Sequence, residues 1–181
     1  ELRSHIGSEH PDLPVVLIGH SMGGLIAARA VLDAQTDYQG LILTGPLLGV
    51  PTPPPAWQAW LLRALSALFP TVKALDIDAS AVSRDQAVVD AYVADPLVHH
   101  DNVPARTVVS LFDEATAVLG CASQVSLPTL LLHGEEDQLT SVAASRQFIE
   151  DLSAVDKQIT VYPGMYHELF NEPEKDDIIR T

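Results

Sequence analysis

The fold is decided at residues 15–28, which read VVLIGHSMGGLIAA. An apolar run comes first, a Gly-x-Ser-x-Gly motif follows, and a stretch rich in leucine and alanine comes after the motif. This order predicts a strand, a sharp turn and a helix, with Ser21 at the apex of the turn. Glycines beside the serine let the backbone turn and bring strand and helix close together. The pattern predicts a nucleophilic serine, and the alternative is an ordinary strand-to-helix turn that contains glycine and serine.

The segments around this turn predict a parallel sheet. Val15–Ile18 is apolar without alternation, which is typical of a strand buried on both faces of such a sheet. Further strands are expected at Leu41–Thr44, Pro128–Gly134 and Gln158–Tyr162. Helices are expected before the first strand, from the turn to about Ala34, and after Thr140 or Ser141, either of which can cap the helix that follows.

The region between the second and third expected strands has a different character. Several prolines precede residues 57–69, where Arg63 is the only charged residue. One helical face there carries Trp57, Trp60, Leu61, Ala64, Leu65 and Leu68. This helix is either buried against the rest of the domain or part of a lid whose apolar face touches lipid or lines an acyl pocket. A second helix pair is expected over Asp95–His100 and Ala105–Leu119.

Composition limits the possible partners. The chain has 181 residues, 47% of them hydrophobic, and a formal net charge of -14, so it predicts one globular domain that repels nucleic acid and anionic membranes. Cys121 is the only cysteine, which excludes an internal disulfide, and we expect a buried thiol. No run of about twenty apolar residues predicts a transmembrane helix. We expect a cytoplasmic protein. Because the first residue is Glu1 and not methionine, a signal peptide removed from the N-terminus is the alternative.

Three residue types that perform nucleophilic catalysis occur in a suggestive order. A serine needs a base to take its proton, and a carboxylate must orient the base and stabilise its charged form. Ser21, Asp137 and His167 each follow an expected parallel strand, so each is placed at one rim of the sheet. Glu135 and Glu136 share the acid loop and are expected to be solvated. Asp137 is preferred because it lies further along the loop and has room to turn back towards the histidine.

The remaining histidines are assigned structural roles. His20 lies in the turn and His133 at a strand end, where packing or a backbone hydrogen bond is the more common role. His99 and His100 are adjacent, so their side chains point apart, and no cysteine or carboxylate cluster has the spacing of a metal site. The sequence therefore predicts no metal.

Four segments together resemble one family. They are His20–Gly24, Asp95–His100, Leu132–Asp137 and Tyr166–Glu172, and the last, with its His-Glu-Leu-x-Asn-Glu run, is the most specific. They look like the monoacylglycerol lipase and lysophospholipase branch of the α/β-hydrolase superfamily. The resemblance implies an α/β fold with a parallel-sheet core, represented by the C-terminal half of the sheet, and an inserted helical cap. The expected parts are core residues 1–45, cap residues 46–126 and core residues 127–181.

The resemblance also implies a catalytic assignment. Ser21 is the expected nucleophile, Asp137 the acid, His167 the base, and the backbone N–H of Met22 one donor to the oxyanion. The expected substrates are monoacylglycerols or lysophospholipids, with no cofactor and with peripheral membrane contact through the cap; no oligomeric state follows. The residues expected to bind the substrate are His20, Leu47, Leu48, Trp57, Trp60 and Leu61.

One departure from the family pattern leaves other readings open. Members begin with further strands and a His-Gly loop that supplies a second oxyanion donor, and no such loop precedes the first expected strand. Loss of one donor typically costs about a hundredfold to a thousandfold in turnover. We therefore expect a fragment, whose first strand would have an open apolar edge. The alternatives to a fragment are a second chain that completes the sheet and a numbering that starts partway through a longer protein. The functional alternatives are a small-ester esterase or peptidase of the same fold, and an inactive hydrolase-fold module.

Overall fold

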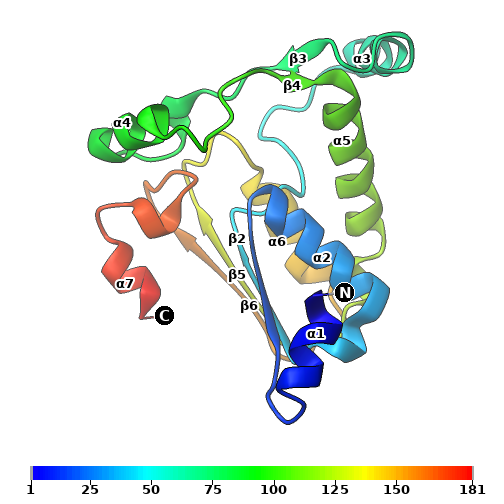
Figure 1. Ribbon diagram of the computed structural model, residues 1–181, viewed down its shortest axis with the longest axis vertical. Helices are drawn as coiled ribbons and strands as arrows, with labels where there is room; N and C mark the ends of the chain where they lie inside the picture. The colour runs from blue at the N-terminus through cyan, green and yellow to red at the C-terminus, as the bar shows by residue number, and fades with distance from the viewer. Residues whose placement is uncertain (1, 181) are drawn as a thin grey trace.

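The computed structural model describes residues 2–180, and its centre is a four-stranded parallel sheet (Figure 1). The strands lie in the order β1-β2-β5-β6. Their bounds are β1 Val16–His20, β2 Gly40–Thr44, β5 Thr129–Gly134 and β6 Lys157–Tyr162. The predicted α/β class and all four predicted strands are confirmed, with ends that differ by one or two residues.

Some helices pack on the two faces of this sheet, and others lie beyond the carboxyl ends of its strands (Figure 1). Their bounds are α1 Leu2–Glu9, α2 Met22–Ala34, α3 Ala56–Leu68, α4 Gln86–Ala94, α5 Ala105–Gly120, α6 Val142–Asp151 and α7 Lys175–Ile179. Residues 2–180 also form four short 3-10 turns, each between a helix and a strand: η1 Gln35–Asp37, η2 Ala79–Ala81, η3 Ala122–Gln124 and η4 Leu169–Asn171. Within residues 2–180, every helix is too short or too polar to cross a bilayer.

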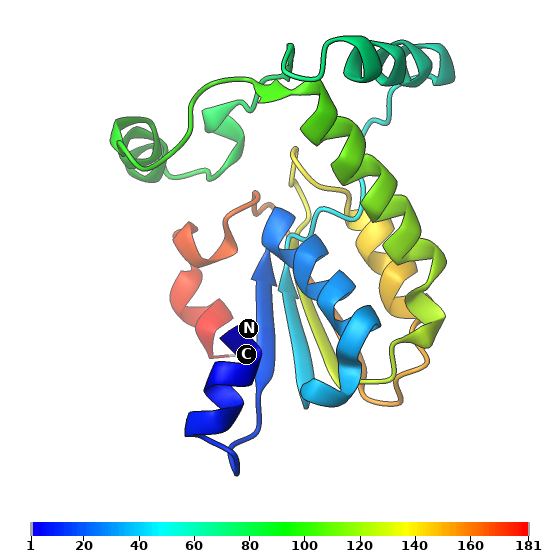
Figure 2. The same cartoon turned by 45° about the vertical axis from the view of Figure 1, so that its right-hand side comes forward.

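Successive side chains of the central strands point to opposite faces of the sheet, so the hydrophobic core has two parts. Leu41, Leu43 and Leu131 point to the same face and join the main hydrophobic cluster. Helices α2, α5 and α6 cover this face (Figure 2). Leu132, on the other face of β5, packs against residues of the histidine loop, η4 and α7. Both clusters hold β5 in place, and β5 precedes the loop that carries Asp137.

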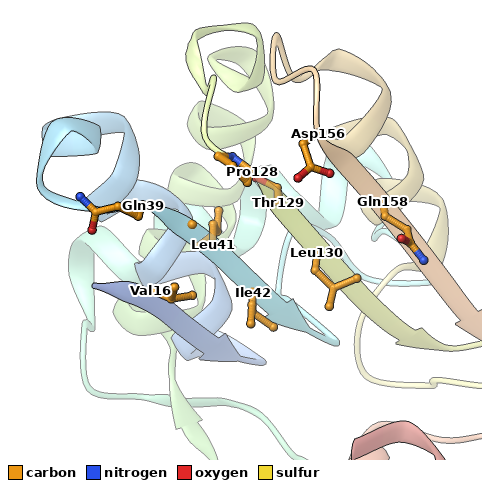
Figure 3. A pocket seen from close by; sticks show the side chains of 10 residues that line it. Val16, Gln39, Leu41, Ile42, Pro128, Thr129, Leu130, Asp156 and Gln158 are labelled. Carbon is orange, nitrogen blue, oxygen red and sulfur yellow. The ribbon is translucent and has the colours of Figure 1, made fainter. Parts of the chain in front are cut away.

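The expectation of burial on both faces is wrong for β1. Ile18 is 64% exposed and Val16 is also exposed, whereas Leu17 packs against the main cluster. Among the described residues β1 is an edge strand, and its second face has no helix packed over these side chains. The same face holds a shallow depression of about 320 Å³ (Figure 3), lined by Val16, Ile42 and Leu130 among others. It lies at the amino-terminal ends of the strands, whereas parallel sheets bind ligands at the opposite ends.

The segment between β2 and β5 lies over the carboxyl ends of the strands (Figures 1 and 2). This inserted segment contains α3, α4, α5 and an antiparallel ribbon of β3 Lys73–Leu75 and β4 Val103–Pro104, a ribbon that the sequence does not predict. The first helix of the predicted pair is wrong: Asp95–His100 is irregular, and the helix in this region is α4, which ends at Ala94. Pro96 explains the end of α4, because a proline disfavours helical geometry in the residue before it.

Helix α5 connects this inserted segment to the core. Its first half packs against α3, where Arg63 forms an exposed ion pair with Asp113. Its second half carries Ala115 and Val118 into the main hydrophobic cluster. Cys121, at the end of α5, is half-buried, whereas the sequence predicts a buried thiol.

The apolar face predicted for α3 does not point into the protein. Trp57 and Trp60 are 64% and 69% exposed, and Leu61 and Leu68 are exposed as well. Leu62 and Ser66 lie on the inner side of the helix. The reading of a fully buried helix is therefore wrong, and the inserted segment presents two tryptophans to its surroundings.

Candidate active site

Ser21 lies at a strained turn between β1 and α2. Its φ of 54° and ψ of −123° make it the only non-glycine residue with positive φ in the described range 2–180. Such a conformation costs about 1–3 kcal/mol and persists only where the surroundings hold it. The Ser21 N–H donates to the Thr44 carbonyl at 3.0 Å, and the Ser21 carbonyl accepts from the Leu47 N–H at 2.9 Å. The end of β2 and the chain after it therefore hold the turn.

Two glycines allow the close packing around this turn. A Cβ on Gly19 would lie 2.5 Å from the Gly23 carbonyl oxygen, and one on Gly24 would lie 2.7 Å from Pro46 Cβ. A Cβ on Gly23 would meet nothing within 4 Å, although Gly23 is the second glycine of the motif. The close approach of strand and helix thus depends on Gly19 and Gly24.

We expect Gly19→Ala to destabilise the protein by about 2 kcal/mol or more, because the new methyl group meets backbone and not a flexible side chain. Gly23→Ala is the matched control, and it should be neutral or raise stability by up to about 1 kcal/mol, since it removes a glycine from the first turn of α2. Urea unfolding measures both. Equal effects of the two substitutions would contradict this account of the turn.

Asp137 and His167 form a buried pair at the carboxyl edge of the sheet. Oδ2 of Asp137 lies 2.7 Å from Nδ1 of His167, and both residues are buried. The other carboxylate oxygen accepts from the N–H groups of Leu139 and Thr140 at 2.8 and 2.9 Å. Since an ionised carboxylate only accepts, Nδ1 of His167 carries hydrogen, and Nε2 is the nitrogen that can take a proton from a nucleophile.

Backbone hydrogen bonds join the acid loop to the histidine loop. The Glu135 N–H donates to the Tyr162 carbonyl at 2.9 Å, and the Glu136 N–H donates to the Met165 carbonyl at 3.0 Å. The side chains of Glu135 and Glu136 are exposed, which confirms that they are solvated. Asp137, the next residue, turns inward to His167.

The ionisation of Asp137 follows from its partners. Burial alone would raise the pKa of this carboxyl, but hydrogen bonds with His133, His167 and the Thr140 N–H outweigh burial and hold the pKa well below its usual range. Asp137 is therefore an anion at neutral pH, although it is buried.

The lowered pKa of Asp137 predicts a stability effect at acid pH. An unfolded aspartate titrates at about 3.9, so the contribution of Asp137 to folding is complete above about pH 5 and is lost as the pH falls through about 4 towards the folded pKa. Unfolding of the wild type and of Asp137→Asn, measured from pH 6 to pH 3, should show a stability difference that narrows as the pH falls. A difference that stays constant would exclude this origin.

His20 brings the turn and the histidine loop together. Its ring lies with its centroid 4.7 Å from that of His167, and its Nδ1 lies 3.0 Å from the Thr44 carbonyl oxygen. The pKa of His20 is lowered, mainly because the ring is buried away from water and secondly because His167 is close to it. Ser21 directly follows His20, so the ring contact places the turn beside the histidine. The expected backbone interaction of His20 is confirmed.

A cavity of about 770 Å³ extends from the turn beneath the inserted segment. Ser21 and Met22 line it together with mostly apolar side chains, among them Leu47, Val50, Pro54, Leu62, Leu75, Ile77, Val103, Val108, Leu111, Phe112 and Leu139. Asp76, Asp78, His99 and Asp101 also line the cavity. In the described part of the chain, no group of three or more His, Cys, Asp or Glu residues is arranged to hold a metal ion.

The cavity includes only part of the predicted substrate-binding set. Leu47 lines it, whereas Leu48 belongs to the main hydrophobic cluster. From α3, Leu62 lines the cavity. Trp57, Trp60 and Leu61 of the same helix are exposed and do not line it. The sequence pattern identified the apolar helix but not the rotation that turns Leu62 inward.

Sequence reasoning missed the partners of Asp137. The Thr140 hydroxyl donates to Asp137 Oδ2 at 2.7 Å, and Ser141 is the residue that caps α6. His133 Nε2 lies 3.2 Å from the same oxygen, which is not the packing or backbone role expected for it. Gly45, with φ +46°, leaves space beside both side chains of the pair, since its Cβ would lie 3.1 Å from His167 Nδ1. Thr140 was recognised only as a candidate helix cap.

Glu168 and Glu172, in the sequence run that begins at His167, form hydrogen bonds with the inserted segment. Glu172 is fully buried, and its carboxylate accepts from the Arg84 N–H at 3.0 Å and from the Arg84 guanidinium. The Glu168 N–H donates to the Val82 carbonyl at 2.8 Å. Two contacts thus join the segment before α4 to the loop that carries His167.

We expect Arg84→Ala to destabilise the protein by about 3 kcal/mol, because it leaves the buried Glu172 carboxylate without its cation. Arg63→Ala removes an exposed ion pair with Asp113 and should leave stability unchanged within error. Chemical denaturation compares the two variants. If both are neutral, the buried ion pair does not hold the inserted segment.

Comparisons with known proteins agree with this architecture. The family model described as serine aminopeptidase, S33, matches residues 1–174. A monoacylglycerol lipase of Mycolicibacterium smegmatis is 37% identical over 168 residues, which are 93% of this chain and 60% of that protein. A monoglyceride lipase of Rattus norvegicus is 32% identical over 176 residues, which are 95% of this chain and 58% of that protein. The chain thus spans about 60% of the length of these curated relatives.

Solved structures agree on the fold. The crystal structure of Paleococcus ferrophilus monoacylglycerol lipase superposes with a TM-score of 0.85 and 30% identity, covering 99% of this chain and 71% of that one. A soluble variant of monoglyceride lipase from Saccharomyces cerevisiae, in complex with a substrate analog, superposes with a TM-score of 0.83 and 20% identity, covering 99% and 62%. The second likeness supports the fold alone.

Proposed function

We propose that this chain, which belongs to the α/β-hydrolase family described as serine aminopeptidase, S33, carries the nucleophile, acid and base of a serine hydrolase that cleaves carboxylic esters of lipids. The observation that carries the proposal is the buried Asp137–His167 pair, at 2.7 Å, whose histidine ring contacts that of His20. The residue after His20 is the strained Ser21, which lines an apolar cavity. Monoacylglycerols or lysophospholipids are the proposed substrates. The monoacylglycerol and monoglyceride lipases among the relatives support this class of substrate.

In the proposed first half-reaction, Ser21 Oγ attacks the ester carbonyl while Nε2 of His167 takes the hydroxyl proton. The carbonyl π electrons move to the oxygen, and the N–H of Met22, the first residue of α2, donates to this oxyanion because helix geometry gives it no acceptor within the helix. Collapse of the intermediate breaks the ester bond. The imidazolium returns its proton to the departing alcohol, glycerol or a glycerophospho alcohol, and leaves an acyl group on Ser21.

The second half-reaction repeats these steps with water. Nε2 of His167 takes a proton from a water molecule, whose oxygen attacks the acyl carbonyl. Breakage of the bond to Ser21 releases the fatty acid, and the proton held by His167 restores the serine hydroxyl. Asp137 stays ionised throughout and stabilises the imidazolium.

Residues 46–126 are proposed as a cap over the acyl site, between core parts 1–45 and 127–181. A fatty acyl chain matches the apolar lining of the cavity, since burial of each methylene contributes about 0.8 kcal/mol to binding. We further propose peripheral contact with a lipid surface through the outer face of α3. Exposed tryptophans are suited to that position, because the indole ring is apolar and its N–H reaches the polar headgroups.

A peptidase or small-ester esterase of the same fold is the second candidate; the description of the family as serine aminopeptidase favours the peptidase. The experiment is to compare release of fatty acid from monooleoylglycerol and oleoyl lysophosphatidylcholine with cleavage of an amino acid nitroanilide and of nitrophenyl acetate. The proposal predicts hydrolysis of one or both lipids with a kcat/KM well above that for the nitroanilide. Cleavage of the nitroanilide alone would assign a peptidase, cleavage of the acetate alone a small-ester esterase, and no turnover an inactive module.

A further inference from the structure

Asp137 has a second histidine partner that the proposed mechanism does not use. His133 is fully buried in β5, and its Nε2 lies 3.2 Å from Asp137 Oδ2 and 3.2 Å from Thr140 Oγ1. On the other side of the ring, Nδ1 lies 2.9 Å from the hydroxyl oxygen of Ser145 in α6, which is also fully buried. The side chains of both histidines thus meet one oxygen of the carboxylate.

The partners of His133 select one of its neutral forms. Oδ2 of the ionised Asp137 has no hydrogen, so a bare Nε2 would place two lone pairs opposite each other. Hydrogen on Nε2 gives a donor to the carboxylate and to the Thr140 hydroxyl, which itself donates to Oδ2 at 2.7 Å. Nδ1 is then bare and accepts from the Ser145 hydroxyl. Every polar atom of the buried ring is satisfied in this arrangement.

We propose that His133 is a positioning residue for Asp137, and that Ser145 holds it as the neutral tautomer with hydrogen on Nε2. Asp137 belongs to a loop, whereas His133 and Ser145 lie on β5 and α6. Donation from a strand limits rotation of the carboxylate and keeps Oδ2 facing His167 Nδ1. A neutral donor does this without adding a second cation beside the imidazolium that forms during catalysis.

The position of the hydrogen is tested by NMR of the protein with ¹⁵N-labelled histidine, with His133 assigned by its loss in His133→Gln. The expected spectrum at neutral pH has His133 Nε2 bonded to hydrogen and Nδ1 bare. Ser145→Ala should leave hydrogen on Nε2, because Asp137 still faces it, and should shift the Nδ1 resonance towards that of a nitrogen that accepts no hydrogen bond. Hydrogen on Nδ1 alone, or on both nitrogens, in the wild type overturns the inference. This test does not require the protein to turn over any substrate.

The positioning role is tested by kinetics with monooleoylglycerol, and this arm rests on the proposed function. His133→Leu should lower kcat by about tenfold to a hundredfold with KM unchanged within about twofold, because it removes one hydrogen bond to a charged group but no contact with substrate. His133→Gln, whose amide nitrogen can replace Nε2 as donor, should recover most of the activity. The exposed His10→Leu is the matched control and should behave as the wild type.

The outcomes separate the inference from the proposed function. An active wild type together with a folded His133→Leu of unchanged kcat overturns the positioning role and leaves the proposed function intact. If His133→Leu does not fold, Ser145→Ala is measured in its place. This variant removes only the hydroxyl that faces His133 Nδ1, and it should lower kcat by about threefold to tenfold. If the wild type does not hydrolyse the lipid, the proposed function fails, and the NMR result alone decides the inference.

Discussion

Replacement of Ser21 by alanine should abolish hydrolysis of monooleoylglycerol, with a loss of about a millionfold in kcat, if the proposed mechanism operates. Without the hydroxyl oxygen no acyl-enzyme can form, and the rest of the site contributes only binding and oxyanion stabilisation. The substitution also replaces the one non-glycine residue that has positive φ in residues 2–180, and alanine there retains the backbone strain. Binding of substrate should therefore persist while turnover is lost.

The exposed Ser110 of α5 provides the matched control for this substitution. Ser110→Ala should retain full activity and the same unfolding midpoint. A Ser21→Ala protein that is folded but keeps more than about one part in a thousand of the wild-type kcat would mean that another group attacks the ester.

Asp137→Asn should lower kcat by about ten-thousandfold, the loss seen where an amide replaces a catalytic aspartate that is paired with histidine. An amide that donates towards His167 favours hydrogen on Nε2, so the nitrogen that must accept the serine proton is blocked. Stability should also fall at neutral pH, because the donors around the carboxylate lose a charged acceptor.

Glu136→Gln changes the neighbouring exposed carboxylate in the same way and should leave kcat unchanged. A loss of less than about tenfold in Asp137→Asn would remove Asp137 from the proposed mechanism. A similar loss in both variants would point to the net charge of the loop and away from the hydrogen bond with His167.

Local patterns were sufficient to predict the sheet. Each strand of the sheet contains a short run of apolar or β-branched residues near turn-forming residues, and Ser21, Asp137 and His167 each follow such a run. The rule that carboxyl ends of parallel strands share an edge then placed the acid and the base close together, and the 2.7 Å hydrogen bond confirms that pairing. The role of Ser21 as nucleophile stays a prediction.

What the sequence missed depends on contacts between distant residues. The open edge of β1 was expected from the family pattern, but the exposure of Val16 and Ile18 was not, because a run of apolar residues does not reveal which face of a strand the helices cover. The β3–β4 ribbon contains only short segments with a proline, too little for a periodic signal. His133 and Ser145 are twelve residues apart on a strand and a helix, so only the packing of α6 on β5 brings them together.

The rotation of α3 is a second case of this kind. Its apolar residues surround the helix, so sequence periodicity could not tell which of them face the cavity. The packing of α3 against α5 accompanies the placement of Leu62 in the wall of the cavity. Trp57 and Trp60 are left outside, which is the basis of the proposed contact with lipid.

The central claim is that Ser21 is a nucleophile activated by His167. Its most direct test is mass spectrometry of peptides after brief treatment of the protein with a fluorophosphonate. The account predicts a single phosphonyl adduct on the peptide that contains Ser21, and its loss in both Ser21→Ala and His167→Ala. A folded protein that gives no adduct, or an adduct on Ser21 that forms equally fast in His167→Ala, would contradict it.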